Sequence, residues 1–138
     1  MSAWFSRALG VLALAAAGCA PSLMPAAIDR TLDGWGVLIK DSAGVSALAG
    51  SSSARLCADI RRTFVKINEP FPVRCQHVRL DMNPLSPNFH VAVGSQPTDG
   101  VLVFVGGPTQ ADCDRIRLGA SRSRWSEVPC RPATLIER

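Results

Sequence analysis

The sequence is poor in several residue types on which common catalytic and metal sites depend. Its 138 residues include no tyrosine, two histidines and two lysines. It has no Cys-x-x-Cys pair, no two histidines at helical spacing and no Gly-x-Ser-x-Gly stretch. These absences remove the usual sequence signatures of zinc sites and of serine-hydrolase sites. The chain is therefore not expected to be an enzyme, and no cofactor and no metal is predicted.

The N-terminal apolar segment is too short to cross a bilayer. Residues 8–17 would span about 15 Å as a helix, against about 30 Å for a bilayer core. The segment follows Arg7 and leads into Ala16-Ala17-Gly18-Cys19. A short apolar run behind a basic residue is typical of an export signal rather than of a membrane anchor.

This N-terminus resembles the lipobox signal peptide of bacterial lipoproteins. The resemblance implies that residues 1–18 are removed and that Cys19 carries the lipid, including palmitate, through which the protein contacts the membrane. Because Ala20 rather than aspartate follows the cysteine, it also implies the periplasmic face of the outer membrane. The alternative is a secretory peptide cut near Ala17 or Ala20, although the second cut would leave Pro21, a poor residue, next in the chain.

The composition beyond the signal fits one folded domain. A hydrophobic fraction of 47% is enough for a packed core. We divide the rest of the chain into a tether, residues 19–32, and a single domain, residues 33–138. The arginines are scattered along the sequence, which indicates a solvated surface, and an exported protein is not expected to bind nucleic acid.

The cysteines predict two disulfides. With Cys19 set aside for lipid, the chain keeps Cys57, Cys75, Cys113 and Cys130. An even number of cysteines in an oxidising compartment indicates disulfide pairs, and four cysteines allow three pairings. The motif Cys-x-x-Ile-Arg occurs at Cys57 and at Cys113, and the next cysteine follows after 18 and 17 residues. This repeat predicts the pairs Cys57–Cys75 and Cys113–Cys130.

The same repeat predicts the fold. Strand-like runs at residues 36–39 and 100–105 precede the two cysteine-bearing helices, and residues 42–53 form an insertion in the first copy. Ser52 or Ser53 would cap the first helix, and Thr109 with Asp112 would form a capping box for the second. Residues 73–80 and 88–93 are also predicted to be strands, because their alternating side chains are typical of half-buried strands. We therefore expect an α+β fold: two βαβ-like units on one sheet, a ferredoxin-like sandwich with an extra strand.

Three further groups of residues were considered as sites. Cys75, His77 and His90 offer zinc-ligating side chains but lack the spacing of a zinc site. The Gly106-Gly107-Pro108-Thr109 turn could present backbone donors to an anion, but a turn with a helix cap is the simpler interpretation. Trp35 and Trp125 are expected to pack at the ends of the sheet, with ligand stacking as the alternative.

The expected function is that of a small non-enzymatic cell-envelope lipoprotein, an adaptor or accessory binding domain. Its partner would be an envelope protein or peptidoglycan. The alternative is a peptidoglycan- or polysaccharide-binding module. This alternative depends on the order of strands and helices and on residues 103–108, which are similar to the second half of SPOR domains.

Overall fold

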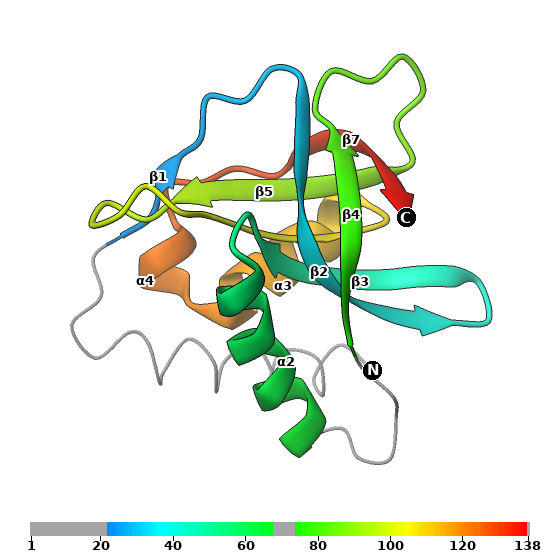
Figure 1. The fold of residues 1–138 in the computed structure, drawn as a ribbon. Coiled ribbons are helices and arrows are strands. Elements are labelled where there is room, and N and C mark those ends of the chain that lie inside the picture. The colour runs from blue at the N-terminus through cyan, green and yellow to red at the C-terminus, as the bar shows by residue number, and fades with distance from the viewer. Residues whose placement is uncertain (1–21, 68–73, 138) are drawn as a thin grey trace.

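The computed structural model describes residues 22–67 and 74–137. Within these ranges seven strands and three helices occur (Figure 1). The strands are β1 (Met24–Pro25), β2 (Thr31–Asp41), β3 (Gly44–Ser51), β4 (Cys75–Asp81), β5 (Phe89–Ser95), β6 (Leu102–Gly107) and β7 (Arg131–Glu137). The helices are α2 (Ala54–Ile67), α3 (Gln110–Ala120) and α4 (Arg122–Trp125).

Six of the strands form a closed antiparallel barrel. The strand order is β5-β6-β3-β2-β4-β7, and β7 also pairs with β5, which closes the ring. Strand β1 is a seventh strand, paired with the end of β5 through Met24 opposite Ser95. The predicted ferredoxin-like α+β sandwich is therefore wrong, because the sheet closes on itself into a barrel instead of forming an open layer covered by helices.

The main error in the fold prediction concerns residues 42–53. We expected a small-residue insertion there, but β3 occupies Gly44–Ser51 and pairs with both β2 and β6. Its small side chains suit a strand at the centre of the wall, because Ala47 and Ala49 lie buried on the helix-covered side. Only the turn of this hairpin has the loop-like backbone that we expected, because Gly44 has a φ of 120°, a conformation that favours glycine.

The barrel interior is filled by one set of alternating side chains. Along β5, Phe89, Val91 and Val93 point inward, whereas Ala92 belongs to the core outside the barrel. The same alternation on the other strands gives an inner cluster of Leu32, Leu48, Val78, Leu80, Met82, Phe104 and Ala133. A period of two along each strand is the pattern of a sheet with one face turned into a barrel.

Close approach of glycine backbone makes room for the largest inner side chain. Phe104 is 1% exposed, and a Cβ at Gly34 would lie 3.3 Å from its Cε2 atom. A Cβ at Gly50 would lie 2.7 Å from its Cε1 atom, closer than real Cβ contacts allow. The absence of side chains at Gly34 and Gly50 thus leaves room for the phenyl ring, and we expect these two contacts to help set the width of the barrel.

A second core lies between the outside of the barrel and the helices. It includes Cys57 and Ile60 from α2, Cys113 and Ile116 from α3, and Trp125 from α4. Cys57 and Ile60 are three positions apart, a spacing that places both on one face of a helix, and both are buried, as is Trp125 on α4. The helices therefore cover part of the barrel wall and leave another part open.

The chain is built from two similar units. Each unit is a β-hairpin, a helix and a last strand that pairs with the first strand of the hairpin. The two units are β2-β3-α2-β4 and β5-β6-α3-β7, with α4 placed between α3 and β7. Pairing of β3 with β6 and of β4 with β7 joins them into the barrel.

Both predicted disulfides are confirmed, one in each unit. Cys57–Cys75 joins α2 to β4, and Cys113–Cys130 joins α3 to the segment that leads into β7. Their Cα atoms are 6.2 Å and 6.1 Å apart, within the range that a disulfide requires. Each bond attaches a helix to the last strand of its own unit, as the repeated motif predicts.

Candidate functional site

Helix α2 covers one end of the outer surface of β2 and β4, and the rest of that surface, together with β7, is a polar and aromatic face that remains accessible. We call it the open face and define it by Asp33, Trp35, His77, Arg79 and Ile136. Their neighbours Leu32, Val78 and Leu80 belong to the inner cluster, so strand alternation directs the open-face side chains outward. His77 is exposed, and Ile136 is 41% exposed.

An aromatic pair forms one end of the open face. Trp35 on β2 is directly opposite His77 on β4. Their rings meet edge to face with centroids 4.8 Å apart and an interplanar angle of 79°. Trp35 is half-buried because its other side packs against the core beneath the helices. The pair therefore presents a positioned ring edge rather than a mobile side chain.

A row of three side chains crosses the strands beside this pair. Asp33 lies opposite Arg79, and Arg79 lies opposite Ile136 on β7. The Arg79 Nε atom is 3.1 Å from the Asp33 carboxylate, and both side chains keep substantial exposure, 36% and 53%. Arginine, tryptophan and an exposed aliphatic side chain side by side are typical of protein-binding surfaces.

The three side chains considered for zinc do not form a site. Cys75 is bonded to Cys57, so its sulfur is not available as a thiolate. His77 lies against Trp35 on the open face, and His90 lies on β5 between Gly107 and Pro132. Residues 22–67 and 74–137 contain no group of three or more metal-ligating side chains.

The turn before α3 is a helix cap. The Asp112 amide donates to the Thr109 hydroxyl at 3.1 Å, and that hydroxyl donates to the Asp112 carboxylate at 2.8 Å. This confirms the predicted capping interaction between Thr109 and Asp112. The carboxylate already supplies negative charge at the start of the helix, so the cap occupies the place that an anion would take.

The pKa of Asp112 lies below its ordinary value. The main cause is the hydrogen bond from the Thr109 hydroxyl, and Arg115 lowers it further by a hydrogen bond and by its charge. Desolvation opposes both effects. A carboxylate with a depressed pKa stabilises the folded state above its unfolded pKa, near 3.9, and loses that contribution as the pH falls through the folded value.

We expect Thr109→Ala to lower the free energy of unfolding by about 1 kcal/mol, the usual cost of removing an N-cap. Asp112→Asn should be destabilising near pH 7, and its difference from the wild type should shrink as the pH falls below about 5 and then through the lowered folded-state pKa of Asp112. Urea unfolding at several pH values measures both effects. Thr98→Ala, in the exposed turn between β5 and β6, is the control. A difference for Asp112→Asn that is independent of pH would contradict the role of its charge.

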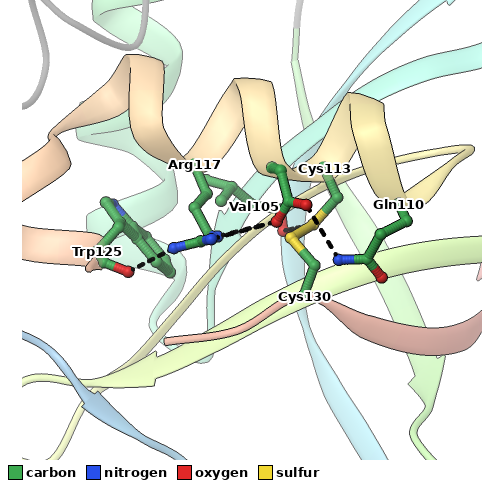
Figure 2. A network of polar contacts seen from close by, with 7 residues as sticks. Val105, Gln110, Cys113, Arg117, Trp125 and Cys130 are labelled. Atoms are coloured by element: carbon green, nitrogen blue, oxygen red, sulfur yellow. Dashed lines mark hydrogen bonds and ion pairs between the residues drawn. A yellow bond between two sulfur atoms is a disulfide. The ribbon is translucent and has the colours of Figure 1, made fainter. Parts of the chain in front are cut away.

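A polar network holds α3 against α4 (Figure 2). The Arg117 Nη1 atom donates to the Trp125 carbonyl at 2.9 Å, and its Nη2 atom lies 3.2 Å from Asp114. Gln110 also donates to Asp114, and the Cys113–Cys130 bond lies beside this group. Trp125 is 5% exposed and lies on α4, so it packs in the core beneath the helices and not at an end of the sheet as we expected. This region is a structural support rather than an accessible site.

Comparisons with protein-family models, with curated proteins and with solved structures gave no match to this chain. None of the helices in the described part of the chain is long and apolar enough to span a membrane. Cys19, the predicted lipidation site, and the signal peptide lie outside the described residues.

Sequence reasoning found part of the open face and missed the rest. Trp35 was considered for ligand stacking and His77 for zinc, but nothing in the sequence indicated that the two residues lie side by side. Arg79 and Ile136 were not singled out as site residues. The alternation of residues 73–80 placed His77 and Arg79 on one side of a strand, which was the available signal. Asp33 had no signal, because its relation to Arg79 depends on the register of β2 and β4.

Proposed function

We propose that this chain is a non-catalytic lipoprotein of the bacterial cell envelope, anchored at the periplasmic face of the outer membrane, that binds a partner protein through its open face. The observation that carries the proposal is the exposed grouping of Trp35, His77, Arg79 and Ile136 on a rigid wall. Two disulfides in one small domain support an oxidising compartment.

A protein partner is favoured by the composition of the open face. Interface centres are enriched in aromatic residues and arginine, and an ion pair at the rim adds orientation more than affinity. The Asp33–Arg79 pair can open to contact a partner, because an exposed ion pair contributes only about 0–1 kcal/mol to stability. The glycan-binding alternative depended on the order of strands and helices and on residues 103–108, and the closed barrel differs from the ferredoxin-like sheet that we expected for that order.

The anchor is tested by Cys19→Ser. This variant is expected to lose lipid attachment, because serine has no thiol to receive the diacylglycerol. Metabolic labelling with palmitate, followed by membrane fractionation, measures the result. The matched control is Cys57→Ser with Cys75→Ser, which replaces the two cysteines of one disulfide and leaves Cys19 intact. Palmitate labelling that persists in Cys19→Ser would contradict the anchor.

The partner surface is tested by photocrosslinking from the full chain in cells. A photoreactive residue at His77 is expected to form an adduct with an envelope protein, whereas one at Thr98, in the exposed turn between β5 and β6, is not. Arg79→Ala should reduce the His77 adduct about tenfold, because arginine is enriched among the few interface residues whose truncation costs more than about 1 kcal/mol.

The matched control for Arg79→Ala is Arg62→Ala. Arg62 also forms an exposed ion pair, with Asp59 on α2, but it lies outside the open face. Equal adducts from His77 and Thr98, or equal loss in both arginine variants, would contradict the open face as the binding site. Capture of the protein by purified sacculi without any protein adduct would contradict a protein partner.

A further inference from the structure

The chain enters the folded domain three residues after Cys19. The Ser22 hydroxyl donates to the Ser123 carbonyl at 3.1 Å, and the Leu23 amide donates to the Arg124 carbonyl at 2.9 Å. The Leu23 side chain is 1% exposed and belongs to the core beneath the helices. Residues 22–32, which we assigned to a tether, thus include β1 and the start of β2.

This attachment limits how far the domain can stand from a lipid on Cys19. Three residues of fully extended chain span at most about 11 Å. That is close to the Debye length of about 8 Å at physiological ionic strength, over which exposed charges still interact. The element to which Ser22 and Leu23 are bonded, α4, must therefore remain near the membrane surface.

The surface at this point carries positive charge that the rest of the domain does not neutralise. Arg122 and Arg124 lie on α4, which has no acidic residue, although Glu127 follows the helix. Within the described ranges neither arginine side chain has a hydrogen bond or an ion pair, and the Arg124 Nε atom is buried without a partner. Partial burial lowers the pKa of Arg124, so an anion beside it would be stabilising.

Four other arginines of the domain differ in this respect. Arg62, Arg79, Arg115 and Arg117 each pair with an aspartate. Met24 directly follows Leu23, whose backbone is bonded to α4, and it is 60% exposed, one of three large apolar side chains exposed in the described part of the chain. An exposed apolar side chain at the same corner of the domain as arginines without partners is a combination that an interfacial membrane contact uses.

We propose that the corner formed by Ser22–Met24 and α4 lies against the membrane, where Arg122 and Arg124 bind the phosphate groups of anionic lipids and Met24 enters the headgroup region. This inference depends on the proposed lipid anchor at Cys19. Contact of this corner with the membrane would fix the orientation of the domain. The β2–β3 hairpin lies at the opposite side of the molecule from α4 (Figure 1), so it would point away from the bilayer. The open face is then held at a set orientation relative to the bilayer.

The test uses the full lipidated chain in vesicles with and without phosphatidylglycerol. An environment-sensitive fluorescent residue is encoded at Met24 or at Ala43, an exposed position in the turn of the β2–β3 hairpin. Headgroup spin-labelled lipid is expected to quench the Met24 probe and to leave the Ala43 probe nearly unquenched. Arg122→Glu should reduce quenching at Met24 severalfold, because one basic residue at an anionic surface shifts the bound population by about fivefold.

The matched control is Lys40→Glu, which makes the same charge change in the hairpin, where Lys40 forms only an exposed ion pair with Glu137. Flotation with the vesicles reports the lipid anchor separately. Protein that floats but shows equal quenching at Met24 and Ala43 would overturn the orientation and leave the anchor intact. Quenching at Met24 that is independent of phosphatidylglycerol and of Arg122 would overturn recognition of anionic lipid. Protein that does not float would overturn the anchor itself.

Discussion

Phe104→Ala is expected to lower the free energy of unfolding by about 3–5 kcal/mol, the range for truncating a buried phenylalanine. Phe104 fills the barrel opposite the backbone of Gly34 and Gly50. Neither glycine has a side chain that could move into the vacated space, so a cavity would remain. A loss of this size is a large share of the 5–15 kcal/mol that typically stabilises a domain.

Denaturant unfolding, followed through tryptophan fluorescence, measures this loss. Leu85→Ala is the control, because Leu85 is fully exposed and its truncation should change stability by less than about 0.5 kcal/mol. A loss below about 1 kcal/mol for Phe104→Ala would show that the barrel collapses around the missing ring. In that case the close glycine contacts would not set its width.

Removal of the Cys113–Cys130 disulfide by a double substitution to alanine is expected to cost about 2–5 kcal/mol. The bond closes a sequence separation of 17 residues, and the chain-entropy model assigns about 3 kcal/mol to a loop of that length. The bond also holds α3 against the strand that closes the barrel. Loss of the bond should therefore loosen α3 and β7 together.

The Cys57–Cys75 double variant is the matched comparison, since that bond closes a separation of 18 residues. Chain entropy alone predicts nearly equal losses of stability. Thermal unfolding and hydrogen exchange of each double variant measure the global and the local effects. An unchanged melting temperature in the Cys113–Cys130 variant, or exchange that rises equally in α2 and α3, would contradict a local role for this bond.

Local features were predictable wherever the signal lay within a few neighbouring residues. Thr109 and Asp112 are three positions apart and form the cap that this spacing predicts. The helical face of Cys57 and Ile60 is buried, as its spacing predicts. The disulfide pairs were predictable for a related reason, because each joins a helix to the strand that follows it in the same unit.

The strand content of residues 44–51 was not predictable in this way. Alanine, glycine and serine have little intrinsic preference for strands, and they form β3 because it lies between β2 and β6. Closure of the barrel was likewise not predictable from local sequence. It depends on β7 changing partner from β5 at Phe89 to β4 at Leu80, two strands that are remote from it in the sequence.

The open face shows the same division between local and distant information. Period-two alternation within β4 already placed His77 and Arg79 on one side of a strand. The register of β2 against β4 brought Trp35 and Asp33 beside them, and β7 supplied Ile136. Register is set by the packing of the inner face, where a slip of one residue would turn the buried side chains outward.

By itself, the sequence determined the helix cap, the buried helical faces and the two disulfides, and it predicts the export signal. Each of these depends on residues close together in the chain or on a motif that occurs twice. The tertiary structure alone decided that the strands close into a barrel and which side chains share its uncovered wall. The physical reason is that strand pairing and inner packing are long-range interactions, and the fit of Phe104 against Gly34 and Gly50 joins three strands that no local pattern connects.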